Sequence, residues 1–205
     1  MKPFFIVLLA ADFALPATAQ TSPVLYPALS KTLDSLAFVD QRPMQEMMRG
    51  QTADSTKKRL VAEQYVNFAR HQPVLEAIVK KCGYPGTKQV GETSAKNFFL
   101  LVQHADAYPV FQEKILKIMS AEVQRKNADN RSFAYLTDRV ALNRGQPQTY
   151  CSQVEYKADG QPTPRNLLDP ANVDKRRASI GMEPLEAYLA KIREMQQQSR
   201  QPKQK

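Results

Sequence analysis

The middle of the chain holds a strongly apolar segment that reads Phe98-Phe99-Leu100-Leu101-Val102. Its length and its Ala, Lys and Gln flanks favour a helix over a strand. Gln103, His104 and Asp106 follow near the C-terminal end of this predicted helix. Because the apolar side chains must face a core, the segment predicts a buried helix that ends in polar groups.

A second helical pattern lies nearer the N-terminus, after Ser22-Pro23. Leucines recur at spacings of four and three from Leu25 to Leu36, which places one apolar stripe on one face of a helix. Pro43 is expected to break or kink this helix, because its ring clashes with the preceding turn.

The rest of the chain shows similar patterns, with one short exception. Further helices are predicted at about residues 55–70, 73–83, 130–145, 172–181 and 184–195, and from Pro109 onward. Residues 149–156 alternate like a strand, and residues 161–165 can return as an edge strand after the turn at Asp159-Gly160. The predicted fold class is mainly α: a single compact helical domain with a small β-hairpin near the C-terminal third.

The first residues have the features of a signal peptide. Lys2 precedes an apolar run over residues 4–11, and Ala17-Thr18-Ala19 fits the small-x-small cleavage rule. The run is too short to span a bilayer, although a buried N-terminal helix is an alternative. We therefore expect a signal peptide (1–19), a helical domain (20–195) and a disordered basic, Gln-rich tail (196–205). The mature chain is expected to be exported, periplasmic or secreted, without a transmembrane segment.

The formal net charge of +9 and the pI of about 9.6 are compatible with nucleic-acid binding. However, the basic residues crowd the C-terminal end or mix with acidic residues along predicted helices. No platform of interleaved aromatic and basic residues is visible. We expect no nucleic-acid partner; the partner is an unknown ligand or protein.

Two cysteines, Cys82 and Cys151, could form a disulfide in an oxidising compartment. The alternative is two separate thiols. The sequence has no CxxC or HxxxH spacing, so neither a metal site nor a cofactor is expected.

Polar residues at segment ends suggest a site. We expect one cluster of His104, Asp138, Arg139, Gln148 and Tyr150. A histidine held by a carboxylate is a plausible general base, and the planar arginine side chain suits an anionic group. The alternative is a hydrogen-bonded core histidine with a structural ion pair.

Other polar residues complete the set of candidates. Asp40 and Gln41, at the end of the first helix, are further binding candidates, as is Arg177. His71 is expected to be a surface residue.

Several motifs recur in a fixed order along the chain. They are Gly83-Tyr84-Pro85, Val90-Gly91, Gln103-His104-Ala105-Asp106, Phe111-Gln112, residues 134–140, residues 145–150, Val173-Asp174, Arg176-Arg177 and Gly181-Met182. In this order they resemble an uncharacterised family, domain of unknown function 6624, over about residues 33–189. The resemblance implies a helical fold with a small hairpin and converging polar motifs, but no established activity. Where the family tends to have Tyr-Gly-Thr-Gln, this chain has Tyr150-Cys151-Ser152-Gln153.

Two functions from different classes follow. The first is a non-catalytic binding or interaction domain of the cell envelope. The alternative is a small hydrolase-like or transferase-like enzyme with His104 as acid/base and Arg139 as anion holder. An enzyme needs these groups to face one open space, whereas an internal network pairs them with each other.

Overall fold

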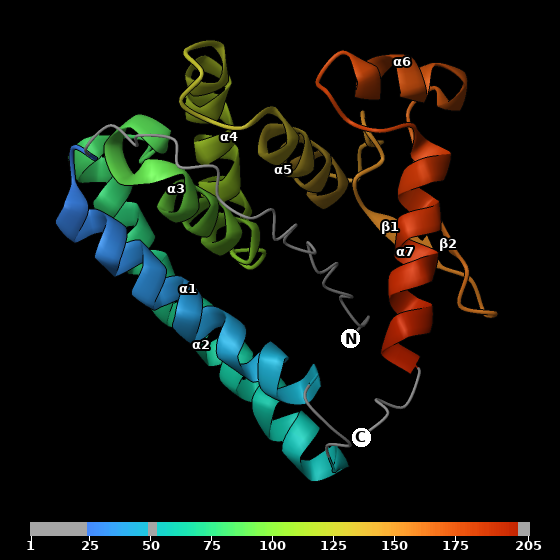
Figure 1. Ribbon diagram of the computed structural model, residues 1–205, viewed down its shortest axis with the longest axis horizontal. Helices are drawn as coiled ribbons and strands as arrows, with labels where there is room; N and C mark the ends of the chain where they lie inside the picture. The colour runs from blue at the N-terminus through green and yellow to red at the C-terminus, as the bar shows by residue number, and fades with distance from the viewer. Residues whose placement is uncertain (1–23, 49–52, 201–205) are drawn as a thin grey trace, which may run out of the picture.

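The computed structural model describes residues 24–48 and 53–200 (Figure 1). The helices are α1 (Pro27–Met48), α2 (Asp54–Cys82), α3 (Thr87–Gln103), α4 (Pro109–Gln124), α5 (Asn130–Asn143), the 3-10 helix η1 (Pro170–Asn172), α6 (Val173–Ala178) and α7 (Leu185–Arg200). Two strands, β1 (Val154–Tyr156) and β2 (Pro162–Pro164), pair antiparallel. The prediction of a mainly α fold with a small hairpin in the C-terminal part is confirmed. The proposed signal peptide lies outside the described residues.

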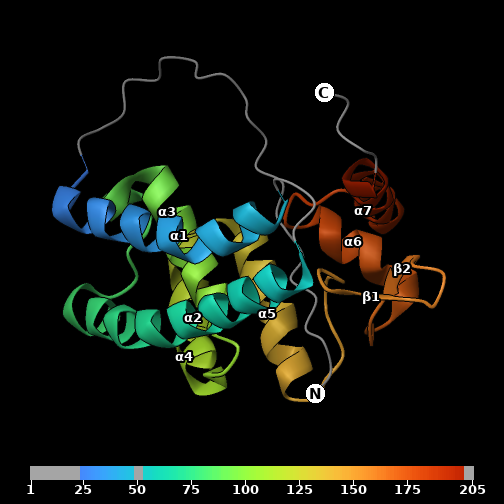
Figure 2. The ribbon, with the colours of Figure 1, turned by 90° about the horizontal axis from the view of Figure 1, so that it is seen from below.

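The core forms around α3, as the apolar segment predicts. Phe98 and Val102 of α3 are fully buried. They belong to one cluster with Leu33 of α1, Leu75 of α2 and Leu136 of α5. Figures 1 and 2 show α1 and α2 as an antiparallel pair alongside α3, and α3 thus joins this pair to α4 and α5.

Of the predicted break or kink at Pro43, the break is absent, because α1 continues through this residue to Met48. Pro43 has no N–H, so the carbonyl of Val39 loses its helical donor. The side chain of Asn67 in α2 replaces that donor: its Nδ2 donates to the Val39 oxygen at 3.2 Å. A tertiary hydrogen bond therefore compensates for the proline.

The predicted separation of residues 55–70 from 73–83 is also wrong, because α2 is one helix that contains Pro73. Leu60, Leu75 and Ile78 continue one buried face across the proline. The carbonyl that Pro73 leaves without a donor belongs to Ala69, an exposed residue that water can reach. Burial of the shared face keeps the two halves together.

The C-terminal part differs from the prediction at two points. The first strand begins only at Val154, because residues 149–152 bind a buried carboxylate, described below. The helix α7 runs to Arg200, so residues 196–200 are helical and do not belong to a disordered tail. Glutamine is a good helix former, and the Gln196 side chain hydrogen-bonds to Tyr156.

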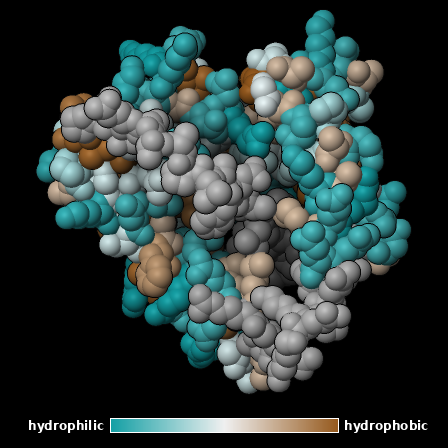
Figure 3. All heavy atoms as spheres, in the orientation of Figure 1, coloured by the Kyte–Doolittle hydropathy of each residue, from teal (hydrophilic) through white to brown (hydrophobic). Residues whose placement is uncertain are grey.

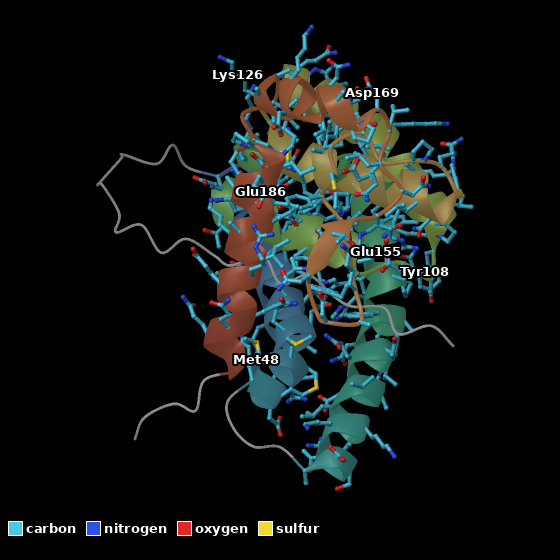
Figure 4. All side chains as sticks on the ribbon, turned by 90° about the vertical axis from the view of Figure 1, so that its right-hand side faces the viewer. Met48, Tyr108, Lys126, Glu155, Asp169 and Glu186 are labelled. Atoms are coloured by element: carbon cyan, nitrogen blue, oxygen red, sulfur yellow. The ribbon has the colours of Figure 1, made fainter. Side chains whose placement is uncertain are left out.

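The molecule has two ends and a mainly hydrophilic surface. In Figure 4 the α1–α2 pair extends downward to Met48, while Lys126 and Asp169 lie at the opposite end. The face drawn in Figure 3 shows apolar residues only in small groups, which is ordinary for a protein surface. Within residues 24–48 and 53–200, none of the helices is both long and apolar enough to cross a membrane.

Candidate functional site

Asp40 is the centre of a polar group where α1, α2 and the end of α3 meet. Its carboxylate is fully buried. His104 Nδ1 lies 2.7 Å from Asp40 Oδ2, and His71 Nδ1 lies 3.6 Å from Oδ1. Gln41 Nε2 donates to Oδ2 at 2.7 Å. One carboxylate thus stands between two imidazoles, and the predicted candidates Asp40 and Gln41 lie beside His104.

The Asp40 carboxylate is held in its ionised form. Burial acts to raise its pKa, but the imidazoles of His104 and His71 and the Gln41 amide outweigh burial and bring the pKa down to about 2. An ionised carboxylate only accepts hydrogen bonds, so His104 carries a proton on Nδ1 and donates it to Asp40 Oδ2. The Phe68 ring, with its centroid 4.9 Å from that of His104, covers the imidazole.

His71 does not lie on the surface as predicted. It is only 5% exposed and faces the same carboxylate as His104. A sequence signal existed: Leu60, Gln64, Asn67 and His71 recur at spacings of four, three and four, the pattern of one helix face. All of these residues are buried.

Glutamine side chains on α2 and α3 each have one buried polar atom without a partner: Gln64 Nε2, Gln72 Oε1, Gln89 Oε1 and Gln103 Oε1. Asp40 Oδ1 and His71 Nδ1 lie 3.6 Å apart and face each other. Gln64 lies two turns before His71 on the same helix face, and Gln103 precedes His104. Folded proteins pair nearly all such atoms, so this concentration needs an explanation.

Arg139 belongs to a second group, with Asp106 as its counter-charge. Arg139 Nη1 donates to Asp106 Oδ2 at 2.6 Å, and Nη2 donates to Gln153 Oε1 at 3.2 Å. Gln112 Nε2 donates to the other Asp106 oxygen at 3.1 Å. The guanidinium is already neutralised, which weakens its predicted role as anion holder.

Asp138 belongs to a third group, in which it organises the loop after α5. Its Oδ1 accepts from the backbone N–H groups of Thr149 and Tyr150 at 2.7 and 3.0 Å. Its Oδ2 accepts from Ser152 N–H at 2.7 Å. Burial raises the pKa of Asp138 despite these donors. Because the loop occupies this carboxylate, it is not the partner of His104.

Gln148 and Arg177 support the same loop. The Gln148 side chain accepts from the Gln153 N–H and donates to its carbonyl, both at 2.8 Å. Arg177 is fully buried, donates to the Tyr150 carbonyl at 2.8 Å, and has its guanidinium 4.9 Å from the Tyr188 ring centroid. The loop is thus held by the side chains of Gln148 and Arg177, and Tyr150 takes part through its backbone.

The predicted cluster is therefore divided: His104 pairs with Asp40, whereas the Arg139 group and the Asp138 loop meet at Gln153. Periodicity predicts which helix face carries a residue, but not which of several nearby partners its side chain selects. The sequence placed Asp106 beside His104 at the end of its helix but did not pair it with Arg139, and Gln153 was not among the candidates.

The two cysteines are free thiols, so the possible Cys82–Cys151 disulfide is absent. Cys82 lies at the end of α2, with its Sγ 3.0 Å from the Ile78 carbonyl oxygen. Cys151 is fully buried in the loop around Asp138, and burial raises the pKa of its thiol to about 11. The two thiols thus lie in different elements, α2 and the loop around Asp138. The high pKa of the Cys151 thiol disfavours the reactive thiolate.

The family model described as "Family of unknown function (DUF6624)" matches residues 27–198. The match covers most of the chain, and the chain belongs to this family. The resemblance of the ordered motifs is thereby confirmed. No curated protein and no solved structure matches the chain. Among the described residues, no group of three or more His, Cys, Asp or Glu side chains is placed to hold a metal ion.

Proposed function

We propose that this protein is a non-catalytic binding domain of the cell envelope, and that the polar group around Asp40 is its recognition site. The unpaired buried glutamine atoms on α2 and α3, next to Asp40 and its two histidines in the helices that surround it, carry this proposal. An unpaired buried donor or acceptor costs about 1–3 kcal/mol. A ligand removes that cost when it supplies a donor to Gln103 Oε1 and an acceptor to Gln64 Nε2.

The envelope location rests on the sequence alone. Lys2, the apolar residues 4–11 and Ala17-Thr18-Ala19 support export. Periplasm and extracellular medium are both oxidising compartments. The two free thiols are compatible with such a place because one of them is fully buried.

A second candidate function is supported by one observation. The 2.7 Å contact between Asp40 and His104 leaves His104 Nε2 as a base, the arrangement a hydrolase-like or transferase-like enzyme needs. Two observations favour binding over catalysis. Arg139 is neutralised by Asp106, and the side chain of His104 is only 5% exposed.

A thermal-shift screen of the full-length chain tests the proposal, with sugars, amino acids, nucleotides and short peptides as probes. We expect a probe that raises the Tm of the natural chain but not that of His104→Gln. A ligand at one hundred times its Kd stabilises by about 2.7 kcal/mol, enough for a clear shift. Glu92→Gln, at an exposed residue of α3, is the control that keeps the response.

The probe is then recovered and its mass measured. Recovery of an unchanged probe agrees with a binding domain. Conversion of the probe by the natural chain but not by His104→Gln establishes the enzyme instead. Equal stabilisation of both chains contradicts the proposed recognition site.

A further inference from the structure

The outer face of α2 carries an apolar stripe. Its residues recur at spacings of three or four, the pattern of one helix face: Ala62, Val66, Ala69, Pro73 and Ala77. All of them are exposed, and Val66 is 47% exposed. The stripe spans about four helical turns.

The stripe lies opposite the face that α2 packs against the protein. His71 follows Ala62 by nine positions, which is about two and a half turns, so the two side chains point to opposite sides. His71 is buried, whereas Ala62 is exposed. Figure 4 shows the lower half of α2 at the edge of the molecule, beside α1. A surface helix normally carries polar residues on its outer face, so an apolar outer face of this length indicates a partner.

Charged residues on the same side of α2 make the stripe complementary to itself. Lys58 and Glu76 are 18 positions apart, and Asp54 and Lys80 are 26 positions apart. Both pairs have position 67 as their midpoint. A two-fold axis at this midpoint places Glu76 opposite Lys58 of a second copy. The same axis places Lys80 opposite Asp54 of that copy.

These four charges are available for contacts with a second copy, because all four side chains are exposed. Within the described part of the chain, Lys58, Glu76 and Lys80 take part in no ion pair. Asp54 makes only an exposed contact within its own helix. A parallel pair of α2 helices would set each charge against the same charge of the other copy, which is repulsive. The charges therefore favour an antiparallel pair.

Small side chains at the centre of the stripe permit close approach of two helices. Tyr65, at the margin of the stripe, is 60% exposed. Tyr65 and Ala69 lie two positions on either side of the midpoint, so in an antiparallel pair Tyr65 of one copy lies level with Ala69 of the other. The tyrosine ring then packs on the alanine methyl group. Arg70 lies at the opposite margin, away from Glu76 and Lys58.

We propose that two copies of this chain associate through α2, as an antiparallel pair around a two-fold axis at position 67. The apolar stripe forms the centre of the interface, and the ion pairs toward its ends set the register. The interface uses the face of α2 opposite His71 and does not depend on the function proposed for the Asp40 group.

Sedimentation velocity of the full-length chain over a series of concentrations tests the proposal. We expect a monomer–dimer equilibrium for the natural chain and a monomer for Ala69→Arg, whose side chain occupies the contact between the helices. Because Ala69 is exposed, this variant should keep the natural circular-dichroism spectrum. A natural chain that stays monomeric at every concentration overturns the proposal, also when it binds phosphatidylglycerol vesicles through this face. A dimer that Ala69→Arg leaves intact overturns it as well.

Charge reversal tests the register. Lys58→Glu and Glu76→Lys should each raise the dimer Kd about tenfold, because two like-charge contacts replace two attractive contacts in every dimer. The double variant restores opposite charges and should regain the natural Kd. Lys57→Glu, at an exposed neighbouring position on another side of α2, is the matched control and should leave the Kd unchanged. A double variant that dimerises no more tightly than the single variants overturns the register.

Cysteine cross-linking tests the two-fold axis. In a Cys82→Ser background, Val66→Cys lies one position from the midpoint and should give a disulfide-linked dimer on mild oxidation. Ala77→Cys lies ten positions from the midpoint, so its two copies are about 30 Å apart along the helices and should stay unlinked. Failure of Val66→Cys to cross-link, or efficient cross-linking of Ala77→Cys, overturns the antiparallel arrangement.

Discussion

At the scale of single residues, one buried carboxylate determines how two distant histidines are placed. Asp40 and His104 are 64 positions apart, yet the hydrogen bond between them fixes the tautomer of His104. The position of Asp40 in turn depends on α1 continuing toward Pro43, and the Asn67 side chain supports that continuation. The candidate site therefore depends on the hydrogen bond from Asn67 to the Val39 carbonyl, which replaces the helical bond that Pro43 cannot make.

Asp40→Asn is expected to lower the free energy of unfolding by roughly 2 kcal/mol at neutral pH. The folded pKa of about 2 lies below the ordinary value of 3.8, so the ionised form stabilises the fold above that value. This contribution is lost as the pH falls through 3.8 toward 2. The difference between natural chain and variant should therefore shrink by about 1 kcal/mol between about pH 5 and pH 3 in urea unfolding.

Glu92→Gln, at an exposed carboxylate, is the control for this measurement. It should leave the free energy of unfolding within about 0.5 kcal/mol of the natural chain. A difference between the natural chain and Asp40→Asn that stays constant down to pH 3 would contradict an ionised, stabilising Asp40.

At the scale of elements, loops are fixed by buried polar groups and by one close backbone contact. Asp138 binds the loop after α5, and Arg177 holds the same loop from α6. At the start of α3, Gly86 lies against the backbone of Asn127: a Cβ on Gly86 would meet the Asn127 oxygen at 2.1 Å. The Asp138 and Arg177 hydrogen bonds and the Gly86–Asn127 contact thus position loops that lie outside the apolar helix faces.

Asp138→Ala should destabilise the protein by about 3 kcal/mol, because three N–H groups, one of them fully buried and two half-buried, lose their acceptor. Thermal unfolding measures the loss, and hydrogen exchange should show faster exchange at residues 149, 150 and 152. The control Asp159→Ala removes an exposed turn carboxylate and should cost less than about 1 kcal/mol. Unchanged exchange in the loop would rule out this role of Asp138.

Gly86→Ala should cost about 1–3 kcal/mol, because the methyl group meets backbone that has to move. Gly145→Ala separates this clash from backbone strain. Gly145 has a φ of 71° but open space around it, so its replacement should cost only about 1 kcal/mol. Urea unfolding of both variants provides the comparison, and a smaller effect at Gly86 than at Gly145 would refute the clash.

At the scale of the whole molecule, the polar groups lie where helices from different parts of the chain meet. The helices α1, α2 and α3 surround Asp40, whereas the Asp138 loop connects α5 to α6 and the hairpin. Figures 1 and 2 show the α1–α2 pair and the C-terminal elements on different sides of α3–α5. A variant at Asp40 should therefore leave the Asp138 loop intact.

Export is a prediction about the whole chain. We expect the protein recovered from its host to begin at Gln20 or within a residue or two, because Ala17-Thr18-Ala19 fits the cleavage rule. Intact-mass measurement of the protein from envelope and cytosolic fractions tests this. Recovery of the full-length chain from the cytosol would contradict export, and Ala19→Arg, which disrupts the cleavage site, should prevent processing.

The sequence by itself determined the helical class, the hairpin and the family. These features depend on residues that are close together in the chain: the leucine spacing, the turn at Asp159-Gly160 and the ordered motifs. Asp40, Gln41 and His104 were also recognised as candidates from the sequence.

Only the tertiary structure decided which polar groups meet. In the structure, α1 continues through Pro43, His71 lies beside Asp40, and Arg139 forms an ion pair with Asp106. The physical reason is that helix periodicity assigns a residue to a face, while its partner depends on how helices cross and on the cost of leaving a buried charge unpaired. Those terms arise only after distant segments have packed together.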